Sequence, residues 1–130
     1  RYLKLIVARL ATYLQIPHYG EALVNVNGWD MDTLKSFRSA PIVAGMTGAI
    51  DSVASYAELA EIEKLIPKEW RPAAVGDAKA CAQRWLDQFN AGADGIIIHA
   101  STPEEFAPVL DEYERIRPAE LFVQRTNRPG

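Results

Sequence analysis

The sequence predicts an α/β fold that is mostly helical and contains two parallel strands, at about residues 73–76 and 94–99. The main observation is the unbroken β-branched run Ile96–Ile98, which is too short for a helix and follows two glycines. A run without polar alternation buries both of its faces, as the strands of a parallel sheet do. A helical pattern lies on each side of this run. The order strand, helix, strand, helix therefore predicts a right-handed crossover, with a further helix behind it.

The two helical patterns around this run have apolar stripes and recognisable ends. Asp77 is a candidate N-cap for the first helix, and Gly92 supplies the left-handed turn that ends it. The first stripe consists of Ala78, Cys81, Ala82, Trp85, Leu86 and Phe89. The second helix opens with a capping box at Thr102–Glu105, in which Pro103 takes the first helical position. The second stripe consists of Phe106, Val109, Leu110, Tyr113 and Ile116.

Residues 1–70 are predicted to be helical. The first helix ends near residue 15, because Pro17 disfavours helical backbone in the residue before it. A capping box at Ser55–Glu58 opens a later helix, which Pro67 closes. Shorter helical segments are expected at 21–26, at 29–38 with Arg38 facing outward, at 41–45 (as a loop or short helix) and at 49–54. The chain is thus predicted to be a single partial domain with a helical region over 1–70, the strand–helix–strand–helix region over 71–117 and a tail over 118–130.

Composition and charge restrict the class of protein. The 130 residues are 48% hydrophobic and 24% charged, which is typical of a globular domain or part of one. The net charge of −3 gives no electrostatic reason to expect nucleic acid or an anionic membrane as partner. A single cysteine, Cys81, allows neither a disulfide framework nor a zinc site, and no run has the length of a membrane span. We expect a cytoplasmic protein without a metal. The chain begins within a helical pattern at Arg1, so we also expect further sequence upstream.

Four residues are candidates for lining a pocket. His99 and Ser101 follow the predicted second strand at its carboxyl end, where parallel α/β folds place ligands. His99 could donate to or accept from a bound molecule, or it could be a structural histidine. His18 and Tyr19 lie in a proline–glycine turn that could line a pocket, although Tyr19 could equally be a core aromatic. A phosphate site at the helix start after Gly76 is disfavoured, because the Asp77 carboxylate would repel an anion.

Six short segments of the sequence, here called phrases, are spread over nearly the whole chain and form one pattern together. They are Ala11–Tyr19, Val26–Asp30, Gly48–Asp51, Leu65–Pro67 with Trp70, Ala74–Gly76 and Ala91–His99. Together they resemble the C-terminal half of one branch of the bacterial luciferase-like monooxygenase superfamily. The resemblance implies the C-terminal portion of a (β/α)8 TIM barrel, with residues 73–76 and 94–99 as its last two strands. On this interpretation, residues from about 16 to 70 form a helical insertion at the mouth of the barrel.

The resemblance also implies a function. Such a protein uses FMN or the deazaflavin coenzyme F-420 and transfers a hydride to or from a small organic substrate, or activates oxygen with the flavin. Most of the cofactor cradle in the superfamily comes from earlier strands, so we assign no catalytic or cofactor-binding residue here and expect the chain alone to be inactive. A small-molecule substrate and a homo-oligomer are the expected partners. The alternatives are a structural or assembly fragment, or a small α/β binding module without catalysis.

Overall fold

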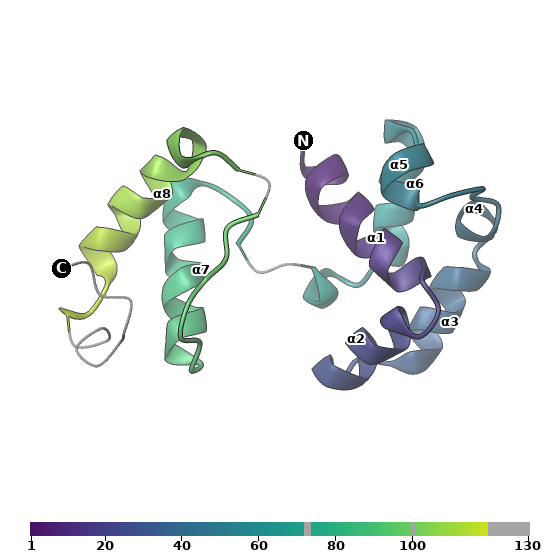
Figure 1. The fold of residues 1–130 in the computed structure, drawn as a ribbon, viewed down its shortest axis with the longest axis horizontal. Coiled ribbons are helices and arrows are strands. Elements are labelled where there is room, and N and C mark those ends of the chain that lie inside the picture. The colour runs from purple at the N-terminus through teal and green to yellow at the C-terminus, as the bar shows by residue number, and fades with distance from the viewer. Residues whose placement is uncertain (72–73, 100, 120–130) are drawn as a thin grey trace. The chain divides into compact units, whose positions relative to one another are not determined.

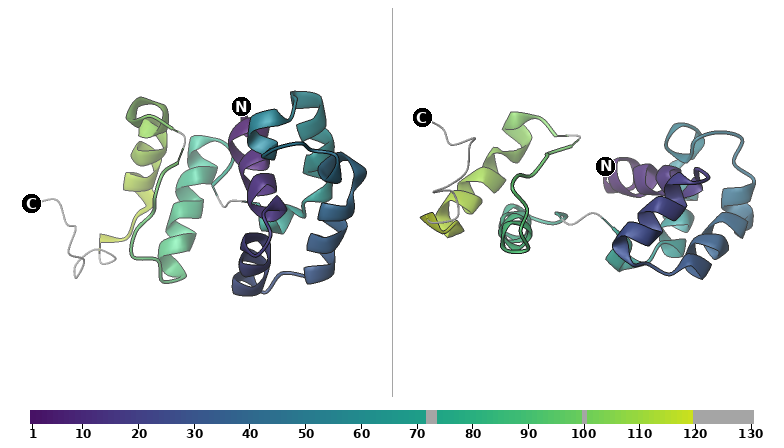
Figure 2. Two further views of the ribbon diagram at one scale, coloured as in Figure 1. Left: turned by 45° about the vertical axis from the view of Figure 1, so that its right-hand side comes forward. Right: turned by 60° about the horizontal axis from the view of Figure 1, so that its bottom comes forward.

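The computed structural model describes residues 1–71, 74–99 and 101–119. Every regular element in these residues is helical. The chain divides into two compact units, Arg1–Pro72 (unit 1) and Ala73–Gly130 (unit 2) (Figures 1 and 2). None of the described helices has both the length and the apolar character needed to cross a bilayer.

Unit 1 is a group of short helices that surround one apolar core. Its elements are the π-helical turn η1 (Leu3–Val7), α1 (Ala8–Gln15), α2 (Tyr19–Asn27), α3 (Met31–Ser39), α4 (Pro41–Ala44), α5 (Ile50–Val53), α6 (Tyr56–Leu65) and the 3-10 turn η2 (Lys68–Trp70). The predicted ends are found in the structure. Proline 17 follows the last turn of α1, and Ser55 and Glu58 form the capping box of α6. Asp30 caps α3 by accepting a hydrogen bond of 2.7 Å from the Thr33 amide.

The core of unit 1 gathers side chains from most of these helices. Its largest fully buried members are Leu14, Val24, Leu34, Phe37, Ile50, Leu59 and Ile62, with Val7 from η1. At its border, the partly buried Trp29 lies on the buried Trp70, with ring centroids 4.7 Å apart and planes only 7° from parallel. The two rings join the start of α3 to the end of the unit. The apolar periodicity of the sequence is therefore used as predicted for amphipathic helices.

Unit 2 consists mainly of α7 (Ala78–Asn90) and α8 (Pro103–Ile116), which pack against each other. Asp77 caps α7 and the Thr102–Glu105 capping box opens α8, both as predicted. Gly92, at φ 103°, follows the end of α7. The fully buried core of the described part of unit 2 is small and comprises Ala82, Trp85 and Tyr113.

The predicted α/β fold is wrong, and with it the assignment of the chain to a TIM barrel. Residues 74–76 and 94–99 form no strand, and residue 73 lies outside the described residues. A strand requires a neighbour whose backbone accepts and donates its ladder hydrogen bonds. The segment 94–99 instead runs beside α7 as non-helical chain (Figures 1 and 2).

The isoleucine run itself shows why this prediction failed. Ile96 and Ile98 are partly buried against the aromatic core of unit 2, whereas Ile97 is 89% exposed. The run is apolar throughout, but only one of its faces is covered, and helices rather than strands cover it. A strand buried on both faces requires neighbouring strands, which the described residues do not supply.

Candidate functional site

The four predicted pocket residues lie in two places. His18 lies in the turn between α1 and α2 in unit 1 and Tyr19 is the first residue of α2, whereas His99 and Ser101 precede α8 in unit 2. Each place is described by itself. Whether these residues line a pocket stays a prediction.

The turn between α1 and α2 has an unusual backbone. His18 has φ +67° and ψ −35°, and it is the one non-glycine residue with positive φ in the part of the chain that the structure describes. Such a conformation is strained for an L-residue whose Cβ carries a ring, and it is retained only where the surroundings enforce it. Local strain of this kind is concentrated at functional sites.

The side chains of this turn face solvent. His18 is exposed, and Tyr19 is 48% exposed, so Tyr19 is a surface residue and the core-aromatic interpretation is wrong. The Tyr19 ring contacts the Tyr13 ring at a centroid distance of 5.2 Å and an angle of 51°. Arg9 precedes Tyr13 by one helical turn in α1, and its Cζ lies 6.0 Å from the centre of the Tyr13 ring. The His18 and Tyr19 side chains are therefore accessible to solvent, and the Tyr13 ring lies against that of Tyr19.

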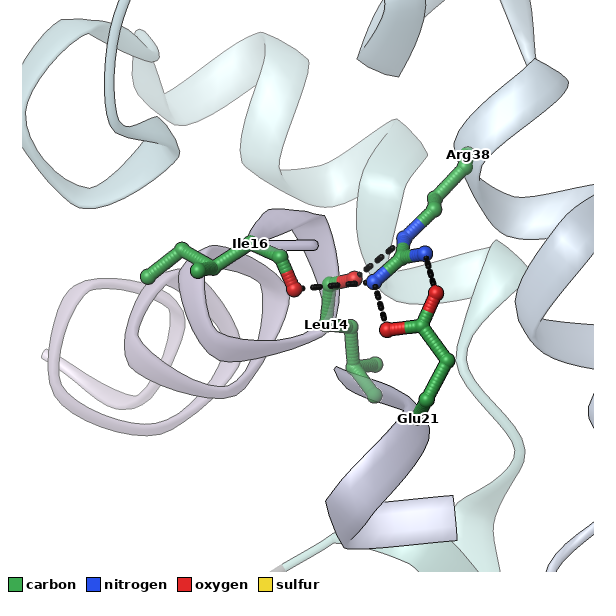
Figure 3. Close-up of polar contacts among 4 residues, drawn as sticks. All are labelled: Leu14, Ile16, Glu21 and Arg38. Carbon is green, nitrogen blue, oxygen red and sulfur yellow. Dashed lines mark hydrogen bonds and ion pairs between the residues drawn. The ribbon is translucent and has the colours of Figure 1, made fainter. Parts of the chain in front are cut away.

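Arg38 of α3 ties both ends of the turn together (Figure 3). Its Nε donates to the Leu14 carbonyl at 2.8 Å, and its Nη2 donates to the Ile16 carbonyl at 2.9 Å. These carbonyls belong to the end of α1, where the helix itself leaves acceptors without partners. On the other side, Nη1 and Nη2 bind both carboxylate oxygens of Glu21 in α2, the Nη2 bond measuring 2.9 Å. A planar guanidinium bound in this two-pronged way fixes orientation as well as distance.

The electrostatics of Glu21 follow from this contact. The hydrogen bond from Arg38 is the largest cause that lowers the pKa of the Glu21 carboxyl, from 4.5 to about 2. Glu21 is therefore ionised at any pH near neutrality, and the ion pair remains intact there.

Gly20 permits the close approach of α2 to Arg38. A Cβ atom at this position would lie 2.6 Å from Arg38 Nη2 and 2.7 Å from the Leu14 carbonyl oxygen. Both distances are far below van der Waals contact, and the second involves backbone, which cannot turn aside. Glycine is a poor helix former. The occurrence of glycine in the first turn of α2 is thus a sequence signal of a close contact, and the predictions from the sequence do not include this contact.

Arg38 and Glu21 were missed by the sequence interpretation. Arg38 was expected to face outward, but only 26% of its side chain is exposed. The surrounding residues of α3 do alternate as an amphipathic helix should, so no local pattern distinguishes Arg38 from a solvated arginine. Its partners lie 17 to 24 positions away in the sequence.

In unit 2, the two candidates lie at the start of α8. His99 is exposed, and Ser101 Oγ donates to Glu105 Oε2 at 3.3 Å. Thr102 is the cap of the helix, with its amide donating to the same carboxylate at 3.0 Å. Ser101 thus supports the helix start, while His99 is presented to solvent.

A hollow of about 340 Å³ lies between α7 and α8. It is lined by Asp77, Lys79, Ala80, Ala82, Gln83, Glu112 and Ile116, and by none of the four predicted residues. Asp77 accepts a hydrogen bond of 2.8 Å from the Ala80 amide, so a carboxylate already occupies the helix start where a coenzyme phosphate would bind. Glu112 adds a second acidic group to the lining. Two carboxylates thus outweigh the one ammonium group of the lining, that of Lys79, so the hollow disfavours the anionic end of a flavin or deazaflavin coenzyme.

The cysteine of unit 2 is a poor candidate for a nucleophile. Cys81 is partly buried, and burial together with the nearby Asp77 raises the pKa of its thiol. A raised thiol pKa lowers the fraction of nucleophilic thiolate. No group of three His, Cys, Asp or Glu side chains suited to a metal ion occurs within residues 1–71, 74–99 and 101–119.

Comparison with known proteins adds no relative: no family model, no curated protein and no solved structure matches this chain.

Proposed function

We propose that this chain is the C-terminal part of an oxidoreductase that uses FMN or coenzyme F-420 and transfers a hydride to or from a small organic substrate. The observation that carries the proposal is the resemblance of six phrases, from Ala11–Tyr19 to Ala91–His99, to the luciferase-like monooxygenase superfamily. The phrases come from both units, which makes a chance match of one short motif a poor explanation. The barrel is not part of this proposal.

The structure supports a proposal in which most of the coenzyme is bound by one part of the protein and the substrate is contacted by another. The exposed His18, Tyr19 and His99 side chains are available to contact a ligand. The acidic hollow of unit 2 disfavours the anionic end of the coenzyme. We therefore assign coenzyme binding to residues outside this chain, and to this chain a role in contacting the substrate or the edge of the coenzyme. The proposed protein is cytoplasmic and acts on a small molecule.

The test uses the complete product of the reading frame that encodes this chain. After purification and incubation with FMN or coenzyme F-420, saturable binding of one of them is expected, visible as a change in its absorption band. Reduction of the bound coenzyme should then be reversed by an organic acceptor. A folded complete protein that binds neither coenzyme would overturn the proposal.

The 130-residue chain serves as the second arm of the same experiment. Titrated with either reduced coenzyme, it should give no saturable signal, because the proposed cradle lies elsewhere. Saturable binding by the chain alone would contradict the assignment of coenzyme binding to residues outside this chain and would assign it to residues of unit 1 or unit 2.

The exposed isoleucine favours a second candidate function, that of an assembly segment. Ile97 is 89% exposed, and no backbone hydrogen bond of Gly95–His99 is found among the described residues. Extended backbone with free donors and acceptors can pair with another chain. Pairing with a second copy would give a concentration-dependent dimer in sedimentation equilibrium, and Ile97→Lys would dissociate it. A monomer at all concentrations excludes this candidate.

A further inference from the structure

We propose that Arg38 is a positioning residue, which holds the turn at His18 in its strained conformation and so fixes the direction of the His18 and Tyr19 side chains. That these side chains meet a ligand rests on the proposed function. The mechanical coupling of Arg38 to the turn does not, and it can be tested in the chain as it stands.

The Arg38 guanidinium binds groups on both sides of the turn. It binds the Leu14 and Ile16 carbonyls before His18 and the Glu21 carboxylate after it (Figure 3). One rigid group therefore holds both sides of the turn, which leaves the intervening residues little freedom to relax. The Ile16 carbonyl also accepts the Gly20 amide at 3.1 Å, so the same oxygen closes the turn from inside.

The backbone of His18 needs stabilisation from other residues. Its backbone conformation is unfavourable for any residue with a Cβ, and its side chain accounts for no capping hydrogen bond of α2. Favourable contacts elsewhere must enforce this conformation. The four hydrogen bonds of Arg38, two of which also carry an ion pair, join the two sides of the turn. They act in addition to the bond that the Ala22 amide donates to the His18 carbonyl at 3.0 Å and to the contact between the Tyr13 and Tyr19 rings.

The backbone conformation of the turn determines the direction in which its side chains reach the surface. A residue with positive φ directs its side chain differently from one in the ordinary helical or extended regions. If the turn relaxed, His18 would rotate away and the contact between Tyr19 and Tyr13 would change. Arg38 is less exposed than His18 and Tyr19, so it would act through them without touching the ligand.

A double-mutant cycle tests the coupling. His18→Gly and His18→Ala both remove the imidazole, but only glycine adopts positive φ without strain. With Arg38 present, His18→Gly should have the smaller unfolding equilibrium constant, by about tenfold relative to His18→Ala. With Arg38→Met, the turn can relax, and this difference should fall to about twofold or less. The constants are measured by urea denaturation of the 130-residue chain, and the entropy of glycine in the unfolded state cancels between the two backgrounds.

Arg71 provides a matched control. It also binds one carboxylate, that of Glu63 at 2.8 Å, and two carbonyls at a helix end, those of Glu63 and Ile66 at 2.9 and 3.0 Å. Arg71→Met should destabilise unit 1 in a comparable way, yet leave the difference between His18→Gly and His18→Ala unchanged. A general loss of stability therefore cannot imitate the expected result.

The cycle remains decisive if Arg38→Met does not fold. Glu21→Gln keeps the shape of the partner but removes its charge, and should reduce the glycine–alanine difference partially. Hydrogen exchange at the Gly20 and Ala22 amides should accelerate in the same variant and not in Glu63→Gln. An undiminished glycine–alanine difference in the Arg38 or Glu21 variants overturns the inference. If the coupling is found while the complete protein binds no coenzyme, the positioning role stands and the proposed function falls.

Discussion

Units 1 and 2 are built from the same kind of amphipathic helix but achieve very different burial. Unit 1 encloses its apolar stripes from several directions, and Leu14, Phe37 and Ile62 are almost inaccessible to solvent. Unit 2 has two long helices and one accompanying segment, and among its described residues only Ala82, Trp85 and Tyr113 are buried. Helical periodicity thus indicates which face of a helix is apolar, but the number of neighbouring elements determines how far that face is removed from water.

This difference has consequences for stability. Burial of apolar area is the main favourable contribution to folding, so unit 1 should account for most of the cooperative unfolding of the chain. Unit 2, whose aromatic side chains remain partly accessible, should open at lower free energy. The following predictions test this contrast, beginning with the largest effect.

The largest effect is expected for Phe37→Ala in the core of unit 1. Phe37 is 2% exposed, so its truncation should lower the free energy of unfolding by about 3–5 kcal/mol. The matched variant Phe106→Ala in unit 2 removes the same ring from a partly buried position. It should cost only about 1–2 kcal/mol, because less area is buried there. Equal losses in urea denaturation would show that the two units do not differ in the way described.

A smaller effect is expected for Gly20→Ala. The added methyl group would meet Arg38 and the Leu14 carbonyl, so we expect a loss of about 1–3 kcal/mol, although alanine is the better helix former. Gly95→Ala is the control in unit 2, where nothing lies within 4 Å of the added atom. It should leave stability unchanged or slightly raised. A stabilised Gly20→Ala variant would contradict the close approach of α2 to Arg38.

Acid should affect unit 1 through Glu21. Its pKa is lowered in the folded state to about 2, from 4.5. The stabilisation due to its ionised form is therefore fully present above pH 4.5 and is lost as the pH falls from there toward 2. Glu21→Gln should flatten this part of the pH profile of unfolding, measured by circular dichroism. Asp32→Asn, which removes an exposed carboxylate paired with Lys35 in α3, is the control and should alter the profile less. Superimposable profiles for wild type and Glu21→Gln would refute the role of the ion pair.

The smallest effect is expected at Ile97 in unit 2. Because this side chain is 89% exposed, Ile97→Thr should change the free energy of unfolding of the monomer by less than about 0.5 kcal/mol. The same substitution at Ile98, which contacts the aromatic core, should cost about 1 kcal/mol. Similar losses at both positions would indicate that the run is covered on both faces after all.

Local signals predicted the helices well because their ends are determined by nearby residues. Pro17, the Ser55–Glu58 box and the Thr102–Glu105 box each act within a few positions of the chain. The strands failed for the opposite reason, since a strand is defined by a partner that a local pattern does not contain. An apolar run such as Ile96–Ile98 indicates that something covers it, without indicating whether this is a sheet or a pair of helices.

The candidate site followed the same rule. The proline and glycine around His18 correctly predicted a turn at this residue, because turn residues act locally, but Tyr19 already belongs to α2. The ion pair of Arg38 with Glu21 joins α3 to α2 through partly exposed side chains, and the apolar periodicity of neither helix indicates it. Only the glycine at position 20 carried local information about that contact, as a poor helix former placed within a helix.

The stacked pair Trp29 and Trp70 gives unit 1 an optical signature of its own. Two nearly parallel indoles 4.7 Å apart are close enough for their electronic transitions to interact, so the absorption and emission of the pair should change when the rings separate. Trp85, the third tryptophan of the chain, lies in unit 2 with its ring at 66° to that of Tyr113. Replacing Trp85 by phenylalanine would confine indole emission to unit 1, and replacing the stacked pair would confine it to unit 2. The melting of each half of the polypeptide can thus be recorded separately by spectroscopy, without cutting the chain.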